Sequence, residues 1–471
     1  MDNTHRKQGK AREFMSEEQS TLRPCALVIL AAGQGSRMNS DLPKVLHPIG
    51  GAPLVAHAMR AGAALEPARI IVVTGHGAEQ VEAAVAAHQD AAICVRQTEQ
   101  LGTGHAVLQA KAALEGFEGD VIVLYGDTPF ISEETLASMQ AARAHYDVIV
   151  LGFEAADPGR YGRLLMQGDA LERIIEAKDA SPEQLAITLC NSGLLVADAT
   201  TLFSLLDEVG NDNAAGEYYL TDVPELARKR GLSASAVRCP EAETLGINTR
   251  AELAAAEQLF QSSKRAEVFE NGVTLIAPET VYFAYDTYIG RDTVIEPFVV
   301  FGPEATVESN ATIRAYSHIE GAHISSGAVV GPYARLRPGA ELDNDVRIGN
   351  FVEIKAAHLG EGAKVNHLSY IGDAEIGAGA NIGAGTITCN YDGVMKHKTT
   401  IGKGAFIGSN TMLVAPVNVG ADALTGSGSV ITQDVPAEAM AIARSKQVNK
   451  PGLAAKLRAH LLALKTKKKG S

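Results

Sequence analysis

Two cations follow a glycine-rich stretch near the start of the chain. The stretch, LAAGQGSRM, begins at Leu30 and comes directly after a short aliphatic run that is typical of a buried parallel strand. Glycines at such a place let the backbone approach a phosphate, and a helix N-terminus beyond them attracts anions. The pattern is not a P-loop, and Met38 stands where a dinucleotide-binding fingerprint has its third glycine. A bare Gly-x-Gly would indicate only a turn, but Arg37 and Lys44 add the two cations that a triphosphate site requires.

An aspartate ends a second aliphatic run. Asp127 closes the segment VIVLYGD, and ligands in open α/β sheets bind beyond the carboxyl ends of the strands. An acidic group there would repel phosphates unless it holds a cation, so the position indicates a Mg²⁺ ligand. The alternative is an aspartate that only caps a helix or closes a turn, and this alternative weakens beside the glycine-rich stretch.

In the second half of the chain, an aliphatic or aromatic residue returns every six positions. The period starts at Ile289, skips one residue after Ile319 and another after Ile354, and is interrupted by an insertion at roughly residues 390–400. A period of six matches neither a helix nor a strand. It fits a parallel β-helix in which each hexapeptide forms a short strand and a turn, and three hexapeptides form one coil. Such a solenoid could also be purely structural and only drive oligomerisation.

One histidine shares a column with residues of neighbouring coils. His367 lies two residues after an inward-pointing position, and the same place in the following coils belongs to Ala384, Ser409 and Ser427. A neutral histidine could accept a proton from an amine that attacks a thioester, because its pKa lies near working pH. The backbone N–H of a residue stacked on it could receive the oxyanion. A lone histidine among 13 would more often be structural, so the hypothesis depends on the column.

Two cations are stacked in the same way. Arg337 and Lys355 each follow an inward-pointing residue, and they stand one coil apart. Stacked cations repel each other, and the pair is explained if an anion such as a sugar phosphate neutralises it. The alternative is a solvated basic edge, and at this point the two are equally open.

The elements that must position these residues follow from the same patterns. Ala26–Leu30, Ile70–Val73 and Val121–Leu124 are predicted as buried parallel strands, with helices at Leu54–Leu65 and Glu79–Ala87 between them. The fold class is therefore α/β, with a doubly wound, Rossmann-like N-terminal domain and a C-terminal parallel β-helix of hexapeptide repeats.

The same patterns predict the domain boundaries. Thr249 and Glu252 form a capping-box signature that opens a helix through about Val268. The expected parts are a mobile N-terminal extension (1–24), the α/β domain (25–248), a linker helix (249–270), the β-helix domain (271–450) and a solvated C-terminal tail (451–471).

Composition limits the classes of protein. The formal net charge of −13 argues against a general nucleic-acid binder, and no apolar run approaches the roughly 20 residues that cross a bilayer. The N-terminus lacks the apolar stretch of a secretory signal, and the five cysteines are scattered without a Cys-x-x-Cys. We therefore expect a cytoplasmic protein with reduced thiols, whose partners are neither nucleic acid nor membrane.

Several motifs carry a resemblance to known families. The glycine-rich stretch with its following Pro-Lys resembles the signature of sugar-phosphate nucleotidylyltransferases, and the repeats resemble the left-handed β-helix of hexapeptide-repeat acyltransferases. The segments QTEQLGTGH (97–105), NHLSY (366–370) and CNYDG (389–393) extend the match from about Ala26 to Arg444. The chain thereby resembles the bacterial family of bifunctional N-acetylglucosamine-1-phosphate uridyltransferase/glucosamine-1-phosphate N-acetyltransferases.

For the first domain, the resemblance implies uridylyl transfer from UTP to N-acetylglucosamine 1-phosphate with release of pyrophosphate. It implies Mg²⁺ as cofactor, held by Asp127 and Asn248, and catalytic roles for Arg37 and Lys44 at the transferring phosphate. It assigns nucleotide and sugar-nucleotide binding to Leu30, Ala31, Ala32, Gly33, Lys44, Gln97, Gly102, Thr103, Tyr125, Gly126, Asp127, Gly162, Glu176, Asn191 and Asn248.

For the β-helix, the resemblance implies acetyl transfer from acetyl-CoA to glucosamine 1-phosphate, with His367 as base. It assigns the amino-sugar phosphate to Arg337, Lys355, Tyr370, Asn381 and Asn390, and acetyl-CoA to Ala384, Asn390, Tyr391, Ser409, Ser427 and Arg444. Ser427 departs from the family's alanine, which weakens its contact with acetyl-CoA. The insertion after Tyr391 is expected to reach across the interface of a homotrimer, and the product would feed peptidoglycan and lipopolysaccharide precursor synthesis.

Three interpretations stand side by side. The leading one is two enzymes in one chain. The second is a single-activity sugar-1-phosphate nucleotidylyltransferase whose β-helix serves assembly or regulation, and the His367 column with Asn390 and Arg444 argues against it. The third is a non-catalytic scaffold of decayed enzyme domains, against which the intact Lys44 and Asp127 argue.

Overall fold

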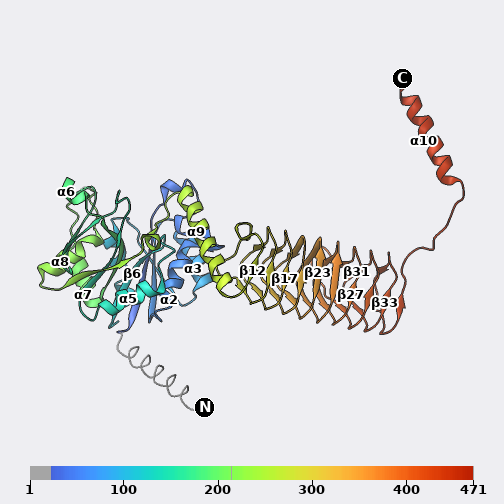
Figure 1. Cartoon of the computed structure of the whole chain (residues 1–471), viewed down its shortest axis with the longest axis horizontal. Coiled ribbons are helices and arrows are strands. Elements are labelled where there is room, and N and C mark those ends of the chain that lie inside the picture. The colour runs from blue at the N-terminus through green and yellow to red at the C-terminus, as the bar shows by residue number, and fades with distance from the viewer. Residues whose placement is uncertain (1–22, 214, 470–471) are drawn as a thin grey trace, which may run out of the picture. The chain divides into compact units, whose positions relative to one another are not determined.

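The computed structural model describes residues 23–213 and 215–469. The chain divides into two compact units, Met1–Lys264 and Arg265–Ser471, of which the first contains helices around a sheet and the second a stack of short strands (Figure 1). Except for Arg23 and Pro24, the predicted N-terminal extension lies outside the described residues. Among the described residues, no helix is both long and apolar enough to cross a bilayer.

The first unit is built on one twisted sheet. Its strand order is β11-β7-β10-β6-β1-β4-β5, with the β8–β9 hairpin attached to β10. The strands β1, β4 and β6 run parallel, as predicted, and β5, which was not predicted, is parallel to β4, whereas β10 runs antiparallel to both of its neighbours. The strands are β1 (Cys25–Ala31), β4 (Arg69–Thr74), β5 (Ile93–Arg96), β6 (Asp120–Tyr125), β7 (Val148–Glu154), β8 (Arg163–Gln167), β9 (Ala170–Ile175), β10 (Leu189–Asp198) and β11 (Ala234–Cys239), and a small separate ladder joins β2 (Pro48–Ile49) to β3 (Ala52–Pro53).

Buried clusters lie on both faces of this sheet. Ala26 and Val28 of β1 belong to one buried cluster, whereas Leu27 and Ile29 belong to another. This alternation explains why β1 is an uninterrupted aliphatic run, because a strand covered on both sides has no polar face. The helices are α2 (Leu54–Ala63), α3 (Ala78–His88), α4 (Thr103–Leu108), α5 (Glu133–Ala142), α6 (Pro182–Leu185), α7 (Ala199–Leu206) and α8 (Val223–Lys229), with 3₁₀ turns η1 (Ser36–Met38), η2 (Lys44–Leu46), η3 (Ala112–Leu114), η4 (Leu220–Asp222) and η5 (Glu241–Thr244). The doubly wound architecture predicted from the sequence is confirmed.

The second unit is a parallel β-helix with three faces. The first face holds β12 (Thr274–Leu275), β14 (Val294–Ile295), β17 (Thr312–Ile313), β20 (Val329–Val330), β23 (Arg347–Asn350), β25 (Lys364–His367), β27 (Asn381–Ile382), β30 (Phe406–Ile407), β33 (Leu424–Thr425) and β35 (Met440–Ala441). The second face holds β15 (Val300–Phe301), β18 (His318–Ile319), β21 (Ala334–Leu336), the first halves of β24 (Val352–Leu359) and β26 (Tyr370–Ile376), β28 (Ile387–Cys389), β31 (Met412–Val414) and β34 (Val430–Ile431). The third face holds β13 (Tyr288–Ile289), β16 (Ala305–Val307), β19 (Ala322–Ile324), β22 (Ala340–Leu342), the second halves of β24 and β26, β29 (Thr399–Ile401) and β32 (Val417–Val419).

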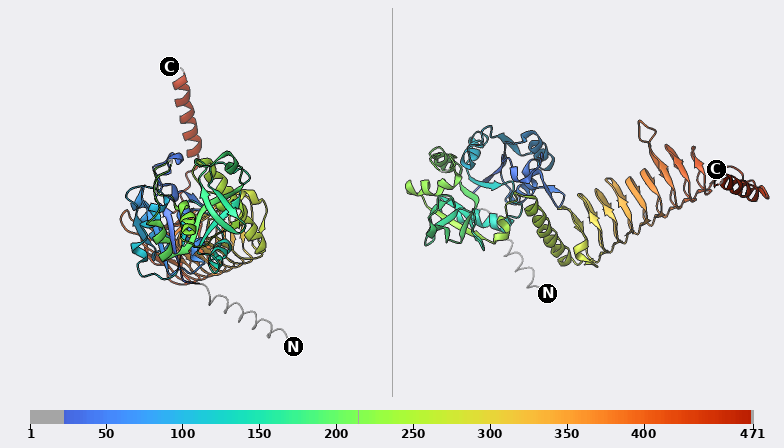
Figure 2. Two further views of the ribbon diagram at one scale, coloured as in Figure 1. Left: turned by 90° about the vertical axis from the view of Figure 1, so that its left-hand side faces the viewer. Right: turned by 90° about the horizontal axis from the view of Figure 1, so that it is seen from above.

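Successive coils pair strand on strand in parallel register. Val294 pairs with Thr312 and Thr312 with Val329, so a coil takes 18 or 17 residues, and the skipped residues in the hexapeptide period are the shorter coils. The periodic aliphatic residues are buried, as Ile313 and Val330 illustrate at 0% exposure. Figure 2 shows the stacked strands side by side, with one loop standing out from the coils. The predicted β-helix is confirmed.

Helices also occur near both ends of the β-helix in the sequence. The helix α9 (Arg250–Glu270) opens with the predicted capping box, in which Thr249 Oγ1 accepts the backbone N–H of Glu252 and the Glu252 carboxylate accepts that of Thr249. A 3₁₀ turn η6 (Pro278–Thr280) follows in the first coil. The C-terminal tail forms the helix α10 (Leu453–Lys469), which the sequence analysis did not predict.

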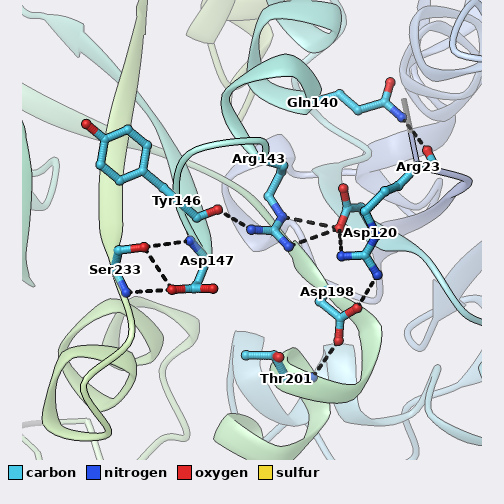
Figure 3. Close-up of polar contacts among 9 residues, drawn as sticks. All are labelled: Arg23, Asp120, Gln140, Arg143, Tyr146, Asp147, Asp198, Thr201 and Ser233. Carbon is cyan, nitrogen blue, oxygen red and sulfur yellow. Dashed lines mark hydrogen bonds and ion pairs between the residues drawn. The ribbon is translucent and has the colours of Figure 1, made fainter. Parts of the chain in front are cut away.

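A buried carboxylate joins the amino ends of several elements in the first unit. Asp120 at the start of β6 is 1% exposed, and its carboxylate pairs with Arg143 at 3.1 Å and with Arg23 at 3.3 Å (Figure 3). Arg23 also pairs with Asp198 at 2.5 Å, and Asp198 accepts the backbone N–H of Thr201 at the start of α7. The network therefore ties the first described residues to β6, α5 and α7.

We predict that Asp120→Asn lowers the free energy of unfolding by about 3 kcal/mol, because it leaves the largely buried Arg143 guanidinium without a counter-charge. The control is Asp207→Asn, which removes an exposed pair with Lys111 and should cost less than about 1 kcal/mol. Urea unfolding of the full chain, followed by circular dichroism, measures both. Equal shifts in the two variants would contradict the prediction.

Candidate active sites

A cavity of about 320 Å³ lies at the carboxyl ends of β1 and β6 in the first unit. Its walls come from the glycine-rich stretch, from η2, from the segment before α4, and from the end of β6. It contains most of the predicted nucleotide residues, namely Leu30, Ala31, Ala32, Gly33, Lys44, Gln97, Gly102, Thr103, Tyr125 and Asp127, together with Val45, Gln100, Ala106 and Glu217, which were not predicted.

The glycine-rich stretch closes tightly against η2. Gly35 has a φ of +60°, and a Cβ atom there would lie 2.5 Å from the Cβ of Lys44. Glycine is therefore required both for the backbone conformation and for the close approach. Lys44 is thereby held beside the mouth of the cavity, with 14% of its side chain exposed.

The Lys44 ammonium joins the two predicted metal ligands. Its Nζ atom donates to the Asp127 carboxylate and, at 3.1 Å, to Oδ1 of Asn248. Both oxygens thus converge on a single positive charge, and each is a donor type that hard divalent cations prefer. The pair fits a divalent cation, and no group of three or more His, Cys, Asp or Glu side chains that could hold a metal occurs in the described part of the chain.

A second close approach shapes the cavity wall before α4. Gly102 has a φ of +109°, and a Cβ there would lie 2.6 Å from the carbonyl oxygen of Tyr218. The Tyr218 segment pairs with this turn through the backbone of Leu101 and Gly104, at 2.8 Å each. The Gln97 side chain is 5% exposed, and its Nε2 donates to the Gly102 carbonyl at 3.1 Å. The turn and the amide are therefore fixed in place together.

The predicted sugar-binding residues form a group around Tyr125. The backbone N–H of Asn191 donates to the Gly162 carbonyl at 2.8 Å, and a Cβ on Gly162 would lie 3.6 Å from Oε1 of Glu176. Burial raises the pKa of the Glu176 carboxyl, which accepts the Thr221 hydroxyl at 3.2 Å. Burial, and then the Asp127 carboxylate, raise the pKa of the Tyr125 phenol, so its hydroxyl keeps its proton.

Six predicted residues lie outside the cavity lining, namely Gly162, Glu176, Asn191 and Asn248, described above, and Arg37 and Gly126. Arg37 is exposed on η1, and Gly126 follows β6 with its backbone N–H bonded to the Leu30 carbonyl at 2.9 Å. Gln100 lies within the motif of residues 97–105 but was not given a role, and Glu217 belongs to no motif. Gln100 lies in the cavity wall because its amide donates to the Ala32 carbonyl at 2.9 Å, and Glu217 because it precedes Tyr218.

In the β-helix, the predicted histidine column exists. Val365, Ile382, Ile407 and Thr425 pair from coil to coil, so the residues two places after them stack at the end of the first face. These residues are His367, Ala384, Ser409 and Ser427, and Arg444 joins them by donating to the Ser427 carbonyl at 2.7 Å.

An asparagine that was not predicted orients the histidine. Nδ1 of His367 lies 3.0 Å from Oδ1 of Asn350 in the preceding coil. An amide oxygen accepts hydrogen bonds, so this contact favours the tautomer of the neutral imidazole in which Nδ1 carries the proton and Nε2 is the acceptor. The exposed imidazole is therefore held as a base, which is the arrangement that the histidine hypothesis requires.

The two predicted cations are joined by a third. Arg337 and Lys355 follow paired residues of β21 and β24, and Arg337 also pairs with Glu353 at 2.8 Å. Lys396, from the insertion, lies beside Lys355, and the two positive charges lower the pKa of the Lys355 ammonium, with a further contribution from Arg337. Three cations at one end of the second face make an anion site more plausible than a solvated basic edge.

Tyr370 begins the second-face half of β26, and its hydroxyl reaches the end of that face at which Asn390 lies. The Asn390 amide donates to the Tyr370 hydroxyl at 3.4 Å and to the Asp373 carboxylate. Asn381 is placed differently, because it lies on β27 of the first face and pairs with Lys364. Tyr391, at 61% exposure, begins the inserted hairpin. The predicted acetyltransferase residues are therefore divided between two faces that meet at the corner residue Leu368.

Comparisons with known proteins agree with this two-part organisation. Residues 27–206 match the model of the MobA-like NTP transferase domain, and residues 286–321 match that of the bacterial transferase hexapeptide of six repeats. The fold and the two candidate sites thus define a transferase with a nucleotidyltransferase-type unit and a hexapeptide-repeat unit.

The relatives in full-length comparisons are all of one kind. A bifunctional protein GlmU of Jannaschia sp. is 67% identical over 450 residues, which are 96% of this chain and 99% of the relative, and one of Ruegeria sp. is 68% identical over 443 residues, 94% and 99%. The chain therefore belongs to the bifunctional GlmU family, and its predicted class, a bifunctional transferase, is confirmed. A solved inositol-1-phosphate CTP transferase from T. maritima covers 51% of this chain and 96% of its own at 18% identity, with a TM-score of 0.41.

We predict that Gly102→Ala lowers kcat/KM for nucleotidyl transfer by at least about tenfold, because the residue would need a strained φ and would collide with the Tyr218 backbone. Gly116→Ala is the control, since its φ of +70° is also strained but no atom lies within 4 Å of the added Cβ. Steady-state assays of both reactions measure the effect, and acetyl transfer should stay unchanged in both variants. A similar loss in the control would show that backbone strain alone is responsible.

Proposed function

We propose that the two units catalyse successive steps in making UDP-N-acetylglucosamine. The β-helix transfers an acetyl group from acetyl-CoA to glucosamine 1-phosphate, and the first unit then transfers a uridylyl group from UTP to the product. The observation that carries this proposal is that one chain contains two separate groups of polar side chains. In the first unit, the Lys44 ammonium lies between the oxygens of Asp127 and Asn248, and in the second, the His367 imidazole is oriented by Asn350. The product would serve cell-wall precursor synthesis.

In the first unit, the cavity positions the two substrates for in-line attack. The sugar phosphate oxygen attacks the α-phosphorus of UTP, the bond to the β-phosphate breaks, and pyrophosphate leaves. Lys44 and Arg37 stabilise the charge that develops on the transferring phosphate and on the leaving group. Gln97 and the Gly102 turn bind the uracil, and Gly162, Glu176 and Asn191 bind the sugar.

We propose that the divalent cation of this site is Mg²⁺, held by Asp127 and Asn248. Bound there, it would neutralise phosphate charge in the way Mg²⁺ does in other nucleotidyl transfers. The oxygen donors and their convergence on the Lys44 ammonium support the assignment. Lys44 would then shift its hydrogen bonds toward the phosphates, since its ammonium and a Mg²⁺ ion at the same two oxygens would repel each other.

In the β-helix, His367 acts as the general base. The amine of glucosamine 1-phosphate attacks the thioester carbonyl, Nε2 of His367 takes the amine proton, and the C–S bond breaks to release coenzyme A, which receives a proton. The backbone N–H of Ala384, one coil beyond His367, is the proposed donor to the oxyanion. Arg337, Lys355 and Lys396 bind the phosphate, while Ser409, Ser427 and Arg444 bind acetyl-CoA.

We further propose that the β-helix assembles as a homotrimer. At the corner between the first and second faces, Phe298, Tyr316, Tyr333 and Phe351 form a stack of rings with centroids 4.9 to 5.2 Å apart. Each ring is about half exposed, and Leu368 continues the column at 62% exposure. An exposed apolar column of this length is typical of an interface. The last residue of this column, Leu368, is next to His367. A second copy of the chain bound to the column would therefore lie beside His367 and could complete the site, whose residues are distributed over two faces in one chain.

We place the enzyme in the cytoplasm. The five cysteines are all free, which is the ordinary state in a reducing compartment. The proposed functional boundaries are 25–248 for uridylyl transfer, 249–270 for the linker helix and 271–450 for acetyl transfer.

The two activities should be separable by single substitutions. We predict that His367→Ala lowers kcat for acetyl transfer by at least about 100-fold and leaves uridylyl transfer unchanged, because only the first reaction needs a base. Asp127→Ala should do the reverse, because it removes a charged ligand from the phosphate site. Assays of both half-reactions on the full chain measure this. Near-normal acetyl transfer in His367→Ala would overturn the base assignment, and no acetyl-CoA turnover by wild type would leave the β-helix an assembly domain.

The ring column gives an independent prediction. Tyr333→Glu should convert the trimer to monomers, because it places a carboxylate in the middle of the apolar column. Tyr288→Glu is the control, since Tyr288 is 58% exposed but lies on the third face. Sedimentation velocity measures the assembly, and acetyl transfer should fall with it while uridylyl transfer persists. A trimer retained in Tyr333→Glu would contradict the placement of the interface.

A further inference from the structure

The insertion is a short hairpin that stands at the corner between the second and third faces. It occupies residues 390–398, between β28 and β29. The backbone N–H of His397 donates to the Asn390 carbonyl at 2.8 Å, and Tyr391 and Lys396 form a bridge above this bond. The hairpin therefore holds its own shape, and its position over the coils depends on how its two ends are attached.

The turn of the hairpin is closed by one carboxylate. Asp392 accepts the backbone N–H of Val394 at 2.8 Å and of Met395 at 2.7 Å, and it pairs with the His397 side chain at 2.7 Å. The side chains of Val394 and Met395 are 86% and 59% exposed. These bonds brace the tip but make no contact with the coils.

Each end of the hairpin is attached to one carboxylate of β26. At the outgoing end, Asn390 donates to Asp373. At the returning end, Nζ of Lys398 donates to Oε2 of Glu375 at 3.0 Å. Asp373 marks the corner with its φ of +48°, so Glu375 lies beyond it on the third face, which carries none of the predicted site residues.

Glu375 is itself held from the preceding coil. Its Oε1 atom lies 2.5 Å from Nδ1 of His358, and Nε2 of His358 lies 3.1 Å from Oδ1 of Asp343. A carboxylate on each ring nitrogen is matched only by an imidazolium, which donates on both sides. The Glu375 carboxylate, with Asp343, raises the pKa of His358 accordingly.

The surroundings of His358 form a cavity of about 390 Å³ under the base of the hairpin. The charged and titratable groups that face His358 from the packed elements are Glu341 and Asp343 from β22 and the turn after it, Asp373 and Glu375 from β26, and Lys396, His397 and Lys398 from the hairpin.

We propose that Glu375 is a positioning residue for the acetyltransferase site: oriented by His358, it anchors Lys398 and thereby fixes the hairpin that presents Asn390 and Lys396 to the sugar phosphate. The inference rests on the acetyl transfer proposed above. Glu375 touches no substrate, and it acts only through the hairpin.

The anchor opposes a repulsion that the site itself creates. The hairpin brings the Lys396 side chain beside that of Lys355, where two ammonium groups would repel each other, and the contact lowers the pKa of Lys355 and raises that of Lys396. Without the Lys398–Glu375 pair, the returning strand would move away from the coils and take Lys396 with it. The sugar phosphate would then lose one of three cations, whereas His367, on the first face, would keep its place.

The first test compares Glu375→Gln and Lys398→Gln with wild type. Both should raise KM for glucosamine 1-phosphate about five- to tenfold, because one charge-assisted bond is lost, and leave kcat and KM for acetyl-CoA within about twofold. Lys398→Arg keeps the charge and should restore KM. The control is His323→Gln, which removes a comparable pair with Glu308 at 3.2 Å in an earlier coil. Hydrogen exchange at the amides of residues 391–397 should become faster in the two Gln variants only.

The second test uses pH. A raised pKa in the folded protein means that the bridge through His358 is complete at low pH and is lost as the pH rises through that pKa. His358→Arg keeps a permanent positive charge. The ratio of KM for glucosamine 1-phosphate in wild type to that in His358→Arg should therefore be near one at pH 6 and about three at pH 9.

The outcomes separate this inference from the function on which it rests. Wild type without acetyl transfer would overturn the proposed function. Normal acetyl transfer with unchanged KM and unchanged hydrogen exchange in Glu375→Gln would overturn only the positioning role. The positioning role would also be overturned if kcat fell in parallel for both reactions, or if KM for glucosamine 1-phosphate rose in His323→Gln as well. Either result would show that the Lys398–Glu375 pair serves stability.

Discussion

Coil-to-coil register is the constraint on which the chemistry of the second unit depends. Each coil places an aliphatic residue inward at fixed intervals, and backbone hydrogen bonds tie it to the next coil in parallel register. Side chains at equal distances from these residues must therefore stack, which is how His367 comes to lie over Asn350 and beneath Ala384. Replacing an inward residue would shift a strand and with it a catalytic contact. The packing of the core therefore determines the positions of the site residues.

The first unit solves a similar problem by a different route. Its strands end together at one edge, so Tyr125 and Asp127 after β6 meet the glycine-rich stretch after β1. Lys44 then joins Asp127 to Asn248, which lies far away in the sequence just before α9. In both units the overall charge of −13 has little influence on binding, because small groups of cations lie where anionic substrates would bind.

Periodicity accounts for most of what the sequence could predict. The hexapeptide period placed Val365, Ile382 and Ile407 in one row, and the aliphatic runs of the first half marked strands that are covered on both faces. The antiparallel β10 was not foreseen, since a buried aliphatic strand looks the same in either direction. The helix α10 was not foreseen either, because its lysine-rich end indicated only a solvated tail.

Sequence analysis missed residues whose roles depend on contacts outside their own repeat. Lys396 belongs to an insertion without a repeat, and only the folded hairpin shows that it lies beside Lys355. Glu375 does belong to the repeat, but it points outward on the third face, where a charged residue ordinarily only contacts solvent. Its contacts with His358 and Lys398 come from coils on either side, so no local pattern could identify it.

The cluster of Arg337, Lys355 and Lys396 shows how binding and stability can oppose each other in this fold. Like charges repel, so without an anion the three cations oppose the placement of the hairpin base, and the contact between two of them lowers the pKa of Lys355 and raises that of Lys396. A sugar phosphate would supply the missing negative charge, so part of its binding energy comes from relief of repulsion already present in the free protein. The contacts that Asp373 and Glu375 make with the hairpin must therefore hold it in place before the substrate binds. A carboxylate in this role must not occupy the place of the phosphate. Glu375 satisfies this condition because it lies around the corner, on the third face.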